Sequence, residues 1–451
     1  MSAMTEKADV LVIGAGIAGV SATYHLAVSH GVDRVVVCDP RAPLTLTSDK
    51  STECYRNWWP GPDDAMVRLM NRSIDLFERW ADESANTFNL TRRGYLYLTA
   101  DPSHLEVMRA QAEAISALGA GELRVHRGAP QDPVYEPGAF DGADLFMDAG
   151  AVLTRFPYVA SEVAGGIHVR RAGWLSAQQL GAWLLDRSFE AGAVYRPDSV
   201  VAIDVSEGRV SGAWLESGRR IETSTVVNAA GPHLGEVAAM LGISLPILHE
   251  VHRKMSFRDQ RRAIPRDAPM MIWDDPQRVS WEPDEREALM RDPELAALAG
   301  VLSPGAHCRP DGGADSPIVL GLWEYRTEVR EPTFPIPEDP MYPEMVVRGL
   351  STMVPALAGY LDRLPQPYVD GGYYTRTVEN RPLIGPAGPE GAYVVGALSG
   401  YGIMAAPAAG ELVASHVVGP PFHVPAGAFL PSRYEDPAYL AAFEETDHGQ
   451  L

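Results

Sequence analysis

Three glycines near the N-terminus have the spacing of a phosphate-binding turn. Gly14, Gly16 and Gly19 form a Gly-x-Gly-x-x-Gly pattern. The first glycine permits a tight turn, the second leaves room for a pyrophosphate, and the third lets a helix pack closely against a strand. Asp39 follows about twenty residues later, where a carboxylate accepts hydrogen bonds from ribose hydroxyls and repels a 2′-phosphate. This chemistry is the binding of FAD or NAD rather than NADP.

The flanking segments predict the elements that must hold this turn. Residues 10–13 read as a buried strand, residues 17–27 as a helix, and residues 34–38 as a second strand that ends at Asp39. Unpaired N–H groups and the positive end of the dipole at a helix N-terminus stabilise phosphate oxygens. An ordinary strand-turn-helix unit is the alternative. The complete order of strand, fingerprint, helix, strand and acid favours the dinucleotide site.

Composition restricts the class of protein. The chain has 451 residues, of which 46% are hydrophobic and 22% charged, and its formal net charge is −21 at pH 7. This length fits two or three globular domains. The negative charge disfavours nucleic acid or an anionic membrane as a partner. Three widely spaced cysteines indicate neither a disulfide framework nor a zinc site, and no signal peptide or membrane span is expected. We expect a cytoplasmic protein.

Later segments also place small residues at the ends of predicted strands. Residues 225–228 predict an apolar strand that continues into Ala-Ala-Gly-Pro, and residues 393–396 predict a strand before a glycine-containing turn and a small-residue helix over 405–418. Small residues let the backbone approach a ligand closely. The periodicity further predicts helices over residues 63–85 and 176–191, a strand over 95–99 and a hairpin over 199–223.

Four landmarks in one order make the chain resemble the superfamily of D-amino-acid oxidase and sarcosine oxidase, which are FAD-dependent amine oxidoreductases. They are residues 14–19 with Asp39, residues 51–56, residues 227–231, and residues 381–385 followed by 399–402. The resemblance implies an α/β fold: a Rossmann-like FAD-binding domain of the glutathione-reductase type and a second, mixed-sheet α+β substrate domain. The implied boundaries are 1–90, 165–244 and 366–420 for the FAD-binding domain, 91–164 and 245–365 for the substrate domain, and 421–451 for a C-terminal tail.

The resemblance also implies which residues contact FAD. They are Gly14, Ala15, Gly16, Ile17, Ala18, Gly19, Asp39, Pro40, Arg41, Ser51, Thr52, Val201, Ala229, Ala230, Gly231, Gly400, Tyr401, Gly402, Ile403 and Met404. In the monomeric sarcosine oxidases a cysteine tethers the flavin, in a segment similar to residues 371–377. Here that position is Gly372, so we expect non-covalent FAD, with Cys54 as an alternative tether.

Residues 47–59 occupy the place of the family's flavin-side loop. Arg56 matches an arginine beside the flavin, where a guanidinium stabilises negative charge on the reduced ring. Lys50 is a candidate for electrostatic activation of oxygen near flavin N5, and Tyr374 is a candidate for orienting the substrate. The alternatives are a structural ion pair for Arg56 and an exposed loop lysine for Lys50.

The usual clamp for a substrate carboxylate is missing. The family's clamp positions correspond to Met404, Trp59 and Tyr374, and its oxygen-activating lysine aligns near Val319. The aromatic residues Trp58, Trp59, Tyr373, Tyr374 and Tyr401, with Trp323 and Tyr325 as further candidates, predict a cage for a bulky amine or an alkylated ammonium group. Arg376 or Arg326 could hold an acid group. The alternative for each ring is that it fills the core.

The sequence therefore predicts an FAD-dependent oxidoreductase that oxidises a C–N bond to an imine by hydride transfer to flavin N5, followed by hydrolysis. The partners are a small-molecule amine and either oxygen or an electron carrier. Two alternatives stay open, a 2-hydroxy acid dehydrogenase on the same fold and a non-catalytic FAD-binding assembly protein. The charged region 259–315, with a helical pattern over 287–302, is a lid, an oligomer contact or a solvated surface insertion. No metal site is expected.

Overall fold

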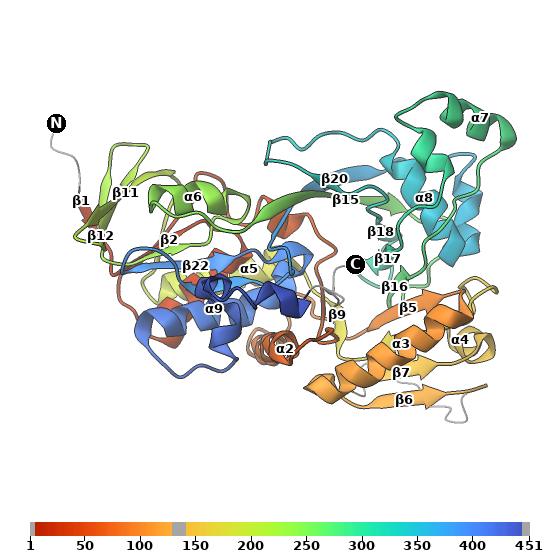
Figure 1. The fold of residues 1–451 in the computed structure, drawn as a ribbon, viewed down its shortest axis with the longest axis horizontal. Coiled ribbons are helices and arrows are strands. Elements are labelled where there is room, and N and C mark those ends of the chain that lie inside the picture. The colour runs from red at the N-terminus through yellow and green to blue at the C-terminus, as the bar shows by residue number, and fades with distance from the viewer. Residues whose placement is uncertain (1–4, 129–140, 444–451) are drawn as a thin grey trace.

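The computed structural model describes residues 5–128 and 141–443. The molecule has two lobes side by side, one built on a parallel sheet and the other on a larger mixed sheet (Figure 1). Two long strands, β15 (Leu248–Arg258) and β20 (Tyr368–Arg376), pair along their length and run from one lobe towards the other. The predicted fold class is therefore confirmed.

Within the described residues, the sheet of the first lobe has six strands. In spatial order they are β10 (Val194–Arg196), β3 (Val35–Cys38), β2 (Val10–Ile13), β14 (Val226–Asn228), β22 (Ala392–Gly396) and β21 (Leu383–Pro386). All neighbours are parallel except β21 and β22. Strands β2 and β3 are apolar and buried throughout, as expected for parallel strands covered on both faces. Three separated segments of the chain thus form one sheet.

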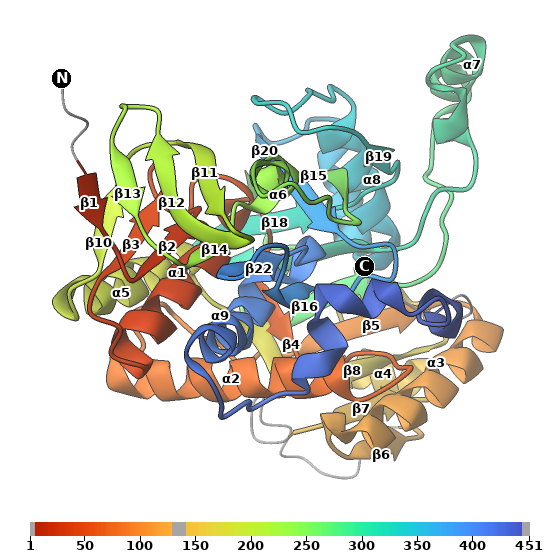
Figure 2. The same cartoon turned by 60° about the vertical axis from the view of Figure 1, so that its left-hand side comes forward.

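Helices α1 (Ile17–Tyr24), α5 (Ala177–Glu190) and α9 (Gly402–Val418) pack together beside this sheet (Figure 2). Small residues bring α1 and α9 close, because a Cβ at Gly410 would lie 2.3 Å from the Ser21 hydroxyl. A four-stranded sheet beside them contains the predicted hairpin. Its strands are β1 (Thr5–Lys7), β13 (Arg220–Glu222), β12 (Arg209–Leu215) and β11 (Val200–Ser206). Helix α6 (Leu234–Met240) comes after β14 in the chain and contacts β11 and β14.

The second lobe is built on a ten-stranded sheet, counted over the described residues. Besides β15 and β20, its strands are β19 (Glu328–Val329), β18 (Ile318–Leu322), β17 (Ala306–Asp311), β16 (Met270–Trp273), β5 (Tyr95–Thr99), β8 (Gly165–Val169), β7 (Ala143–Phe146) and β6 (Leu123–His126). Helices α3 (Pro102–Ile115), α4 (Ala149–Arg155) and α8 (Tyr342–Met353) pack on it. A short pair, β4 (Cys54–Arg56) with β9 (Ala172–Trp174), lies between the lobes.

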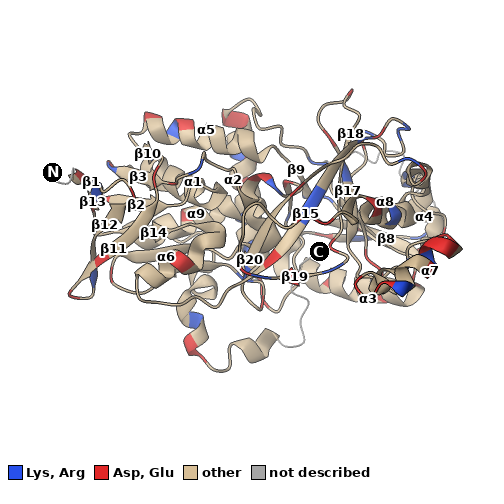
Figure 3. Cartoon of the chain, turned by 90° about the horizontal axis from the view of Figure 1, so that it is seen from above, with Lys and Arg blue, Asp and Glu red and all other residues tan. Residues whose placement is uncertain are grey.

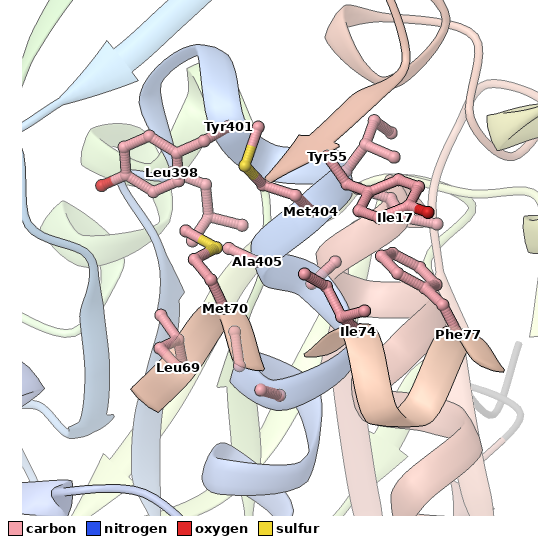
Figure 4. Packing of buried hydrophobic residues seen from close by; sticks show 14 of the residues in the cluster. Ile17, Tyr55, Leu69, Met70, Ile74, Phe77, Leu398, Tyr401, Met404 and Ala405 are labelled. Atoms are coloured by element: carbon pink, nitrogen blue, oxygen red, sulfur yellow. The ribbon is translucent and has the colours of Figure 1, made fainter. Parts of the chain in front are cut away.

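Helix α2 (Ala65–Glu83) forms the predicted 63–85 helix and packs against α9. Its apolar face contributes Met70, Ile74 and Phe77 to a core that also contains Tyr401 and Met404 from the start of α9 (Figure 4). This packing fixes the N-terminal end of α9. The described part of the chain contains no helix that is both long and apolar enough to cross a membrane.

Two expectations differ from the structure. The helix predicted over 287–302 is the shorter α7 (Pro283–Arg291), which projects from the body on a long excursion (Figure 2). It carries both acidic and basic side chains (Figure 3). Strand pairing also divides the chain differently from the predicted boundaries, because β8 and β20 belong to the ten-stranded sheet rather than to the parallel one. Residues 444–451 of the predicted tail lie outside the described part.

Candidate active site

Two cavities meet between the lobes. The first, which we call the dinucleotide cavity, lies over the glycine turn and the ends of β2, β3, β14 and β22. The second, which we call the inner cavity, is lined by β4, β15, β17, β18 and β20. Tyr374, Ser399 and Gly400 line both cavities. A ligand in the first cavity can therefore present one end to a second molecule in the other.

The glycine turn has the geometry that the sequence predicts. Gly14 has φ +104°, and a Cβ on it would lie 2.5 Å from the Ala229 carbonyl oxygen. A Cβ at Gly19 would lie 1.9 Å from the Gly14 carbonyl oxygen. Both positions exclude a side chain, one because the conformation and the space forbid it and the other because helix α1 touches the turn.

Asp39 and Ser48 hold the turn in place. The Asp39 carboxylate accepts hydrogen bonds from the backbone N–H groups of Ala15 and Arg41, both at 2.8 Å. The Ser48 hydroxyl accepts one from the N–H of Ile17 at 3.0 Å, at the start of α1. Asp39, Arg41 and Ser48 all line the dinucleotide cavity. A carboxylate at the end of β3 is where a dinucleotide site places its ribose contact.

The turn before α9 carries strained backbone and an unpaired hydroxyl. Ala397 and Ser399 have φ of 56° and 46°, values that non-glycine residues rarely adopt. The buried Ser399 hydroxyl finds no hydrogen-bond partner among the described residues. Strain of this kind concentrates at ligand sites, and the N-terminus of the 17-residue α9 adds a positive dipole end. The cradle, the acid and the unpaired hydroxyl together fit FAD.

Aromatic rings form one wall of the inner cavity. Trp59, Tyr95, Tyr374 and Tyr401 line it. Trp59 and Tyr401 contact each other edge to face, with centroids 4.9 Å apart. Arg56 lies over the Trp59 ring at 4.6 Å, and its Nε donates to the carbonyl of Trp58 at 3.1 Å. The wall therefore combines ring faces with a guanidinium held against them.

Strands β15 and β20 contribute polar groups to the inner cavity as well. The buried carboxylate of Glu250 accepts a hydrogen bond from Arg376 Nη2 at 2.6 Å. The His252 ring stacks on Tyr374, with centroids 3.8 Å apart and planes 15° from parallel. Burial lowers the pKa of His252 although Glu250 lies beside it, so the imidazole is neutral at pH 7.

Two further titratable side chains line the inner cavity. His307 on β17 is hydrogen-bonded to the carbonyl of Gly305, and burial lowers its pKa to about 4. Glu324 follows β18 and accepts a hydrogen bond from the backbone N–H of Arg253 at 2.6 Å. Burial raises the pKa of Glu324 to about 8, so this carboxyl is largely protonated at pH 7 when no cation is bound.

Most of the predicted FAD contacts come together. Those that line the dinucleotide cavity are Gly14, Gly16, Ile17, Ala18, Asp39, Arg41, Ser51, Ala229, Ala230, Gly231, Gly400, Gly402 and Ile403. Thr52, Tyr401 and Met404 line the inner cavity instead. Ala15, Gly19 and Pro40 belong to the turn or its neighbours without lining a cavity, and Val201 is half exposed on β11 and lies away from both cavities.

The predicted substrate and catalytic residues divide into two groups. Arg56, Trp59, Tyr374, Arg376 and Tyr401 line the inner cavity. The other candidates lie elsewhere. Trp58, Trp323 and Tyr325 are buried in the core, Tyr373 lines the dinucleotide cavity, Arg326 packs on Tyr325, and Val319 packs in the core of the second lobe.

Lys50 does not reach either cavity. Its ammonium pairs with Asp370 at 2.6 Å and with Asp49 at 3.2 Å. A second lysine, Lys254, donates instead to the backbone carbonyls of Asp49 and Ser51, at 2.6 and 3.1 Å. Both lysines therefore hold the flavin-side loop.

Sequence reasoning missed Glu250, His252, His307 and Glu324. The first two alternate along β15, and that period of two was a readable signal that one face of the strand is polar. For His307 and Glu324 no local pattern existed. No cluster of His, Cys, Asp and Glu suited to a metal ion occurs among the described residues.

Comparisons with known proteins agree with this geometry. A family model described as FAD dependent oxidoreductase matches residues 9–416. Mitochondrial dimethylglycine dehydrogenase of Mus musculus is 22% identical over 268 residues, an alignment that covers 59% of this chain and only 28% of that protein. Among solved structures, L-proline dehydrogenase from P. horikoshii has a TM-score of 0.73 at 21% identity, over 96% of this chain and 99% of that one. Glycine oxidase from Geobacillus kaustophilus has a TM-score of 0.72 at 16% identity, over 95% and 99%.

Proposed function

Because the chain belongs to the family of FAD-dependent oxidoreductases, which acts on amine and amino-acid substrates, we propose that it oxidises a C–N bond to an imine that water then hydrolyses. The observation that carries this proposal is the junction of the two cavities at Tyr374, Ser399 and Gly400. The dinucleotide cavity has the shape and polar groups for FAD, and the inner cavity offers room for a small substrate at the same junction.

FAD, when bound, supplies the acceptor for a hydride. Gly14, Gly16 and Asp39 would hold its pyrophosphate and ribose, and the turn before α9 would meet its ring system. Non-covalent binding is supported at position 372, because glycine has no side chain to bond to the flavin and a Cβ there would lie 3.1 Å from Thr47 Cα. The alternative tether, Cys54, lines the inner cavity rather than the dinucleotide cavity.

The side chains of the inner cavity position the substrate. Tyr374 lies at the junction and orients the amine, and Trp59 closes the wall and excludes water. The guanidinium of Arg56 would stabilise the negative charge of the reduced flavin ring. Arg376, held by Glu250 and by the carbonyls of Thr377 and Val378, presents a guanidinium edge to a substrate carboxylate.

Three of the similar solved structures support an amino-acid-type substrate: L-proline dehydrogenase, glycine oxidase and iminodiacetate oxidase. They include both dehydrogenases and oxidases, so oxygen and an electron carrier both remain candidates for the acceptor. The ion pair of Lys50 with Asp370 gives no support to a role for Lys50 in oxygen activation. The curated relative is far longer than the matched region, so its activity enters only as part of this proposal.

A second candidate function is supported by one observation. Oxidation of a 2-hydroxy acid requires a base for the hydroxyl proton, and the neutral histidines His252 and His307 both line the inner cavity. This candidate predicts that hydroxy acids reduce the flavin and that amines do not.

The test is anaerobic titration of the purified flavoprotein with N-methyl amino acids, cyclic and aromatic amino acids, polyamines and 2-hydroxy acids. Loss of flavin absorbance with one amine class supports the proposal, and reoxidation by air then identifies oxygen as a competent acceptor. Reduction by hydroxy acids alone supports the second candidate. Retention of bound FAD without reduction by any compound contradicts both and favours a non-catalytic FAD-binding protein.

Two variants assign the residue roles. We expect Tyr374→Phe and Arg56→Ala to slow flavin reduction by about tenfold or more, because each removes a polar contact at the reacting end of the cavity. Tyr368→Phe is the matched control for the tyrosine, since Tyr368 lies on the same strand with 65% of its surface exposed. Wild-type reduction rates in both cavity variants would contradict these assignments.

A further inference from the structure

Glu324 lies at a break in the ten-stranded sheet. Strand β18 ends at Leu322. Beyond that point the Glu324 carboxylate, instead of a strand carbonyl, accepts the hydrogen bond from the backbone N–H of Arg253 on β15. Its own carbonyl accepts a hydrogen bond from the Ser303 hydroxyl at 2.8 Å. The Arg253 N–H therefore holds the carboxyl group and Ser303 holds the backbone of the same residue, and Glu324 lines the inner cavity.

Glu324 has no ion-pair partner of opposite charge among the described residues, 5–128 and 141–443. The guanidinium of Arg253 binds the carbonyl of Pro337 at 3.1 Å and contacts Glu328 at 3.5 Å. Two arginines line the same cavity: Arg376 is paired with Glu250, and Arg56 lies over the Trp59 ring and donates to the carbonyl of Trp58. Nearby Glu328 and Asp339 add negative charge, which favours the protonated carboxyl.

A carboxyl that is half-buried in a cavity and has no ion-pair partner is costly to ionise unless a cation enters beside it. We propose that Glu324 binds a second, non-reacting cationic nitrogen of the substrate, which is therefore an amine or amino acid with a basic side chain. This inference rests on the proposed function. The reacting nitrogen must be neutral to release a hydride from its neighbouring carbon, whereas the nitrogen at Glu324 keeps its charge. Arg376 in the same cavity suits the carboxylate of such a substrate.

The test compares ligands that differ only in the distal cation. Lysine is paired with norleucine and ornithine with norvaline, each also as its N-methyl form, and binding to the holoenzyme is read anaerobically from the perturbation of the flavin absorbance. We expect the cationic member of at least one pair to bind about tenfold tighter or more. In Glu324→Gln that preference falls to within about threefold, because the amide oxygen keeps the bond to the Arg253 N–H but carries no charge.

Glu328→Gln is the matched control. Glu328 is near Glu324 in the chain but does not line the inner cavity, so this variant should keep the preference for the cationic ligand. A second readout is proton release. Binding of lysine at pH 7 should release more protons than binding of norleucine, and this excess should disappear in Glu324→Gln, because the cation ionises the carboxyl.

The outcomes separate the inference from the proposed function. Absence of any preference between paired ligands, or a preference that survives Glu324→Gln, overturns the inference even when amines reduce the flavin. A preference that depends on Glu324 supports the inference even when no ligand reduces the flavin, a result that would contradict the proposed function alone.

Discussion

Gly400 tests whether the junction of the two cavities is as tightly packed as the structure indicates. A Cβ at this position would lie 2.4 Å from Tyr374 Cε2 and 2.9 Å from Tyr374 Cδ2. Carbon atoms in contact need about 3.5 Å, so Gly400→Ala must displace the ring by about 1 Å. The ring cannot move freely, because one of its faces stacks on His252 with centroids 3.8 Å apart. Overpacking of this kind costs about 1–3 kcal/mol.

The overpacking should destabilise the flavin site, because Gly400 and Tyr374 line both cavities. We expect Gly400→Ala to raise the dissociation constant of FAD by about 5- to 150-fold, the equivalent of about 1–3 kcal/mol. The assay is fluorescence titration of the apoprotein with FAD, with urea unfolding in parallel. Gly427→Ala is the matched control, because a Cβ there has no neighbour within 4 Å.

A double-mutant cycle identifies the cause. Tyr374→Ala removes the ring, so adding Gly400→Ala in that background should cost less than about 0.5 kcal/mol. The reasoning is refuted if Gly400→Ala leaves FAD affinity and stability unchanged, or if its cost is the same with and without the Tyr374 ring.

Three further predictions concern stability and FAD binding. Burial raises the pKa of Glu324 from its ordinary 4.5 to about 8, so the apoprotein should lose stability as the pH rises between these two values. The slope should be at most about 1.4 kcal/mol for each pH unit. In urea unfolding, Glu324→Gln should lose less stability between pH 5 and pH 9 than the wild type. Arg433→Ala removes the ion-pair partner of the buried Glu379, at 2.8 Å, and should lower the free energy of unfolding by about 3–5 kcal/mol in thermal unfolding. The pair of Arg187 with Glu190 is exposed, so Arg187→Ala should lower it by less than about 1 kcal/mol. Asp39→Ala should weaken FAD binding at least about tenfold, and unchanged affinity would contradict its place in the cradle.

The sequence by itself determined the dinucleotide cavity. Gly14, Gly19 and Asp39 lie within one short unit of strand, turn, helix and strand, so their spacing already specifies which backbone groups meet a ligand. The small residues before α9 were readable for the same local reason. The family resemblance implied that three separated segments build the FAD-binding domain but gave no strand order, which comes from the sheet itself.

Only the tertiary structure decided the inner cavity. Neighbouring residues on a strand point to opposite faces, and the register with the next strand decides which face meets the site. Thus Tyr374 reaches the junction while the hydroxyl of Tyr373 bonds to Thr333, and Lys50 is held by Asp370 although it lies in the flavin-side loop. Glu324 enters the cavity because β18 ends two residues before it, beside β15. Such placements depend on contacts between distant strands, which local sequence patterns do not encode.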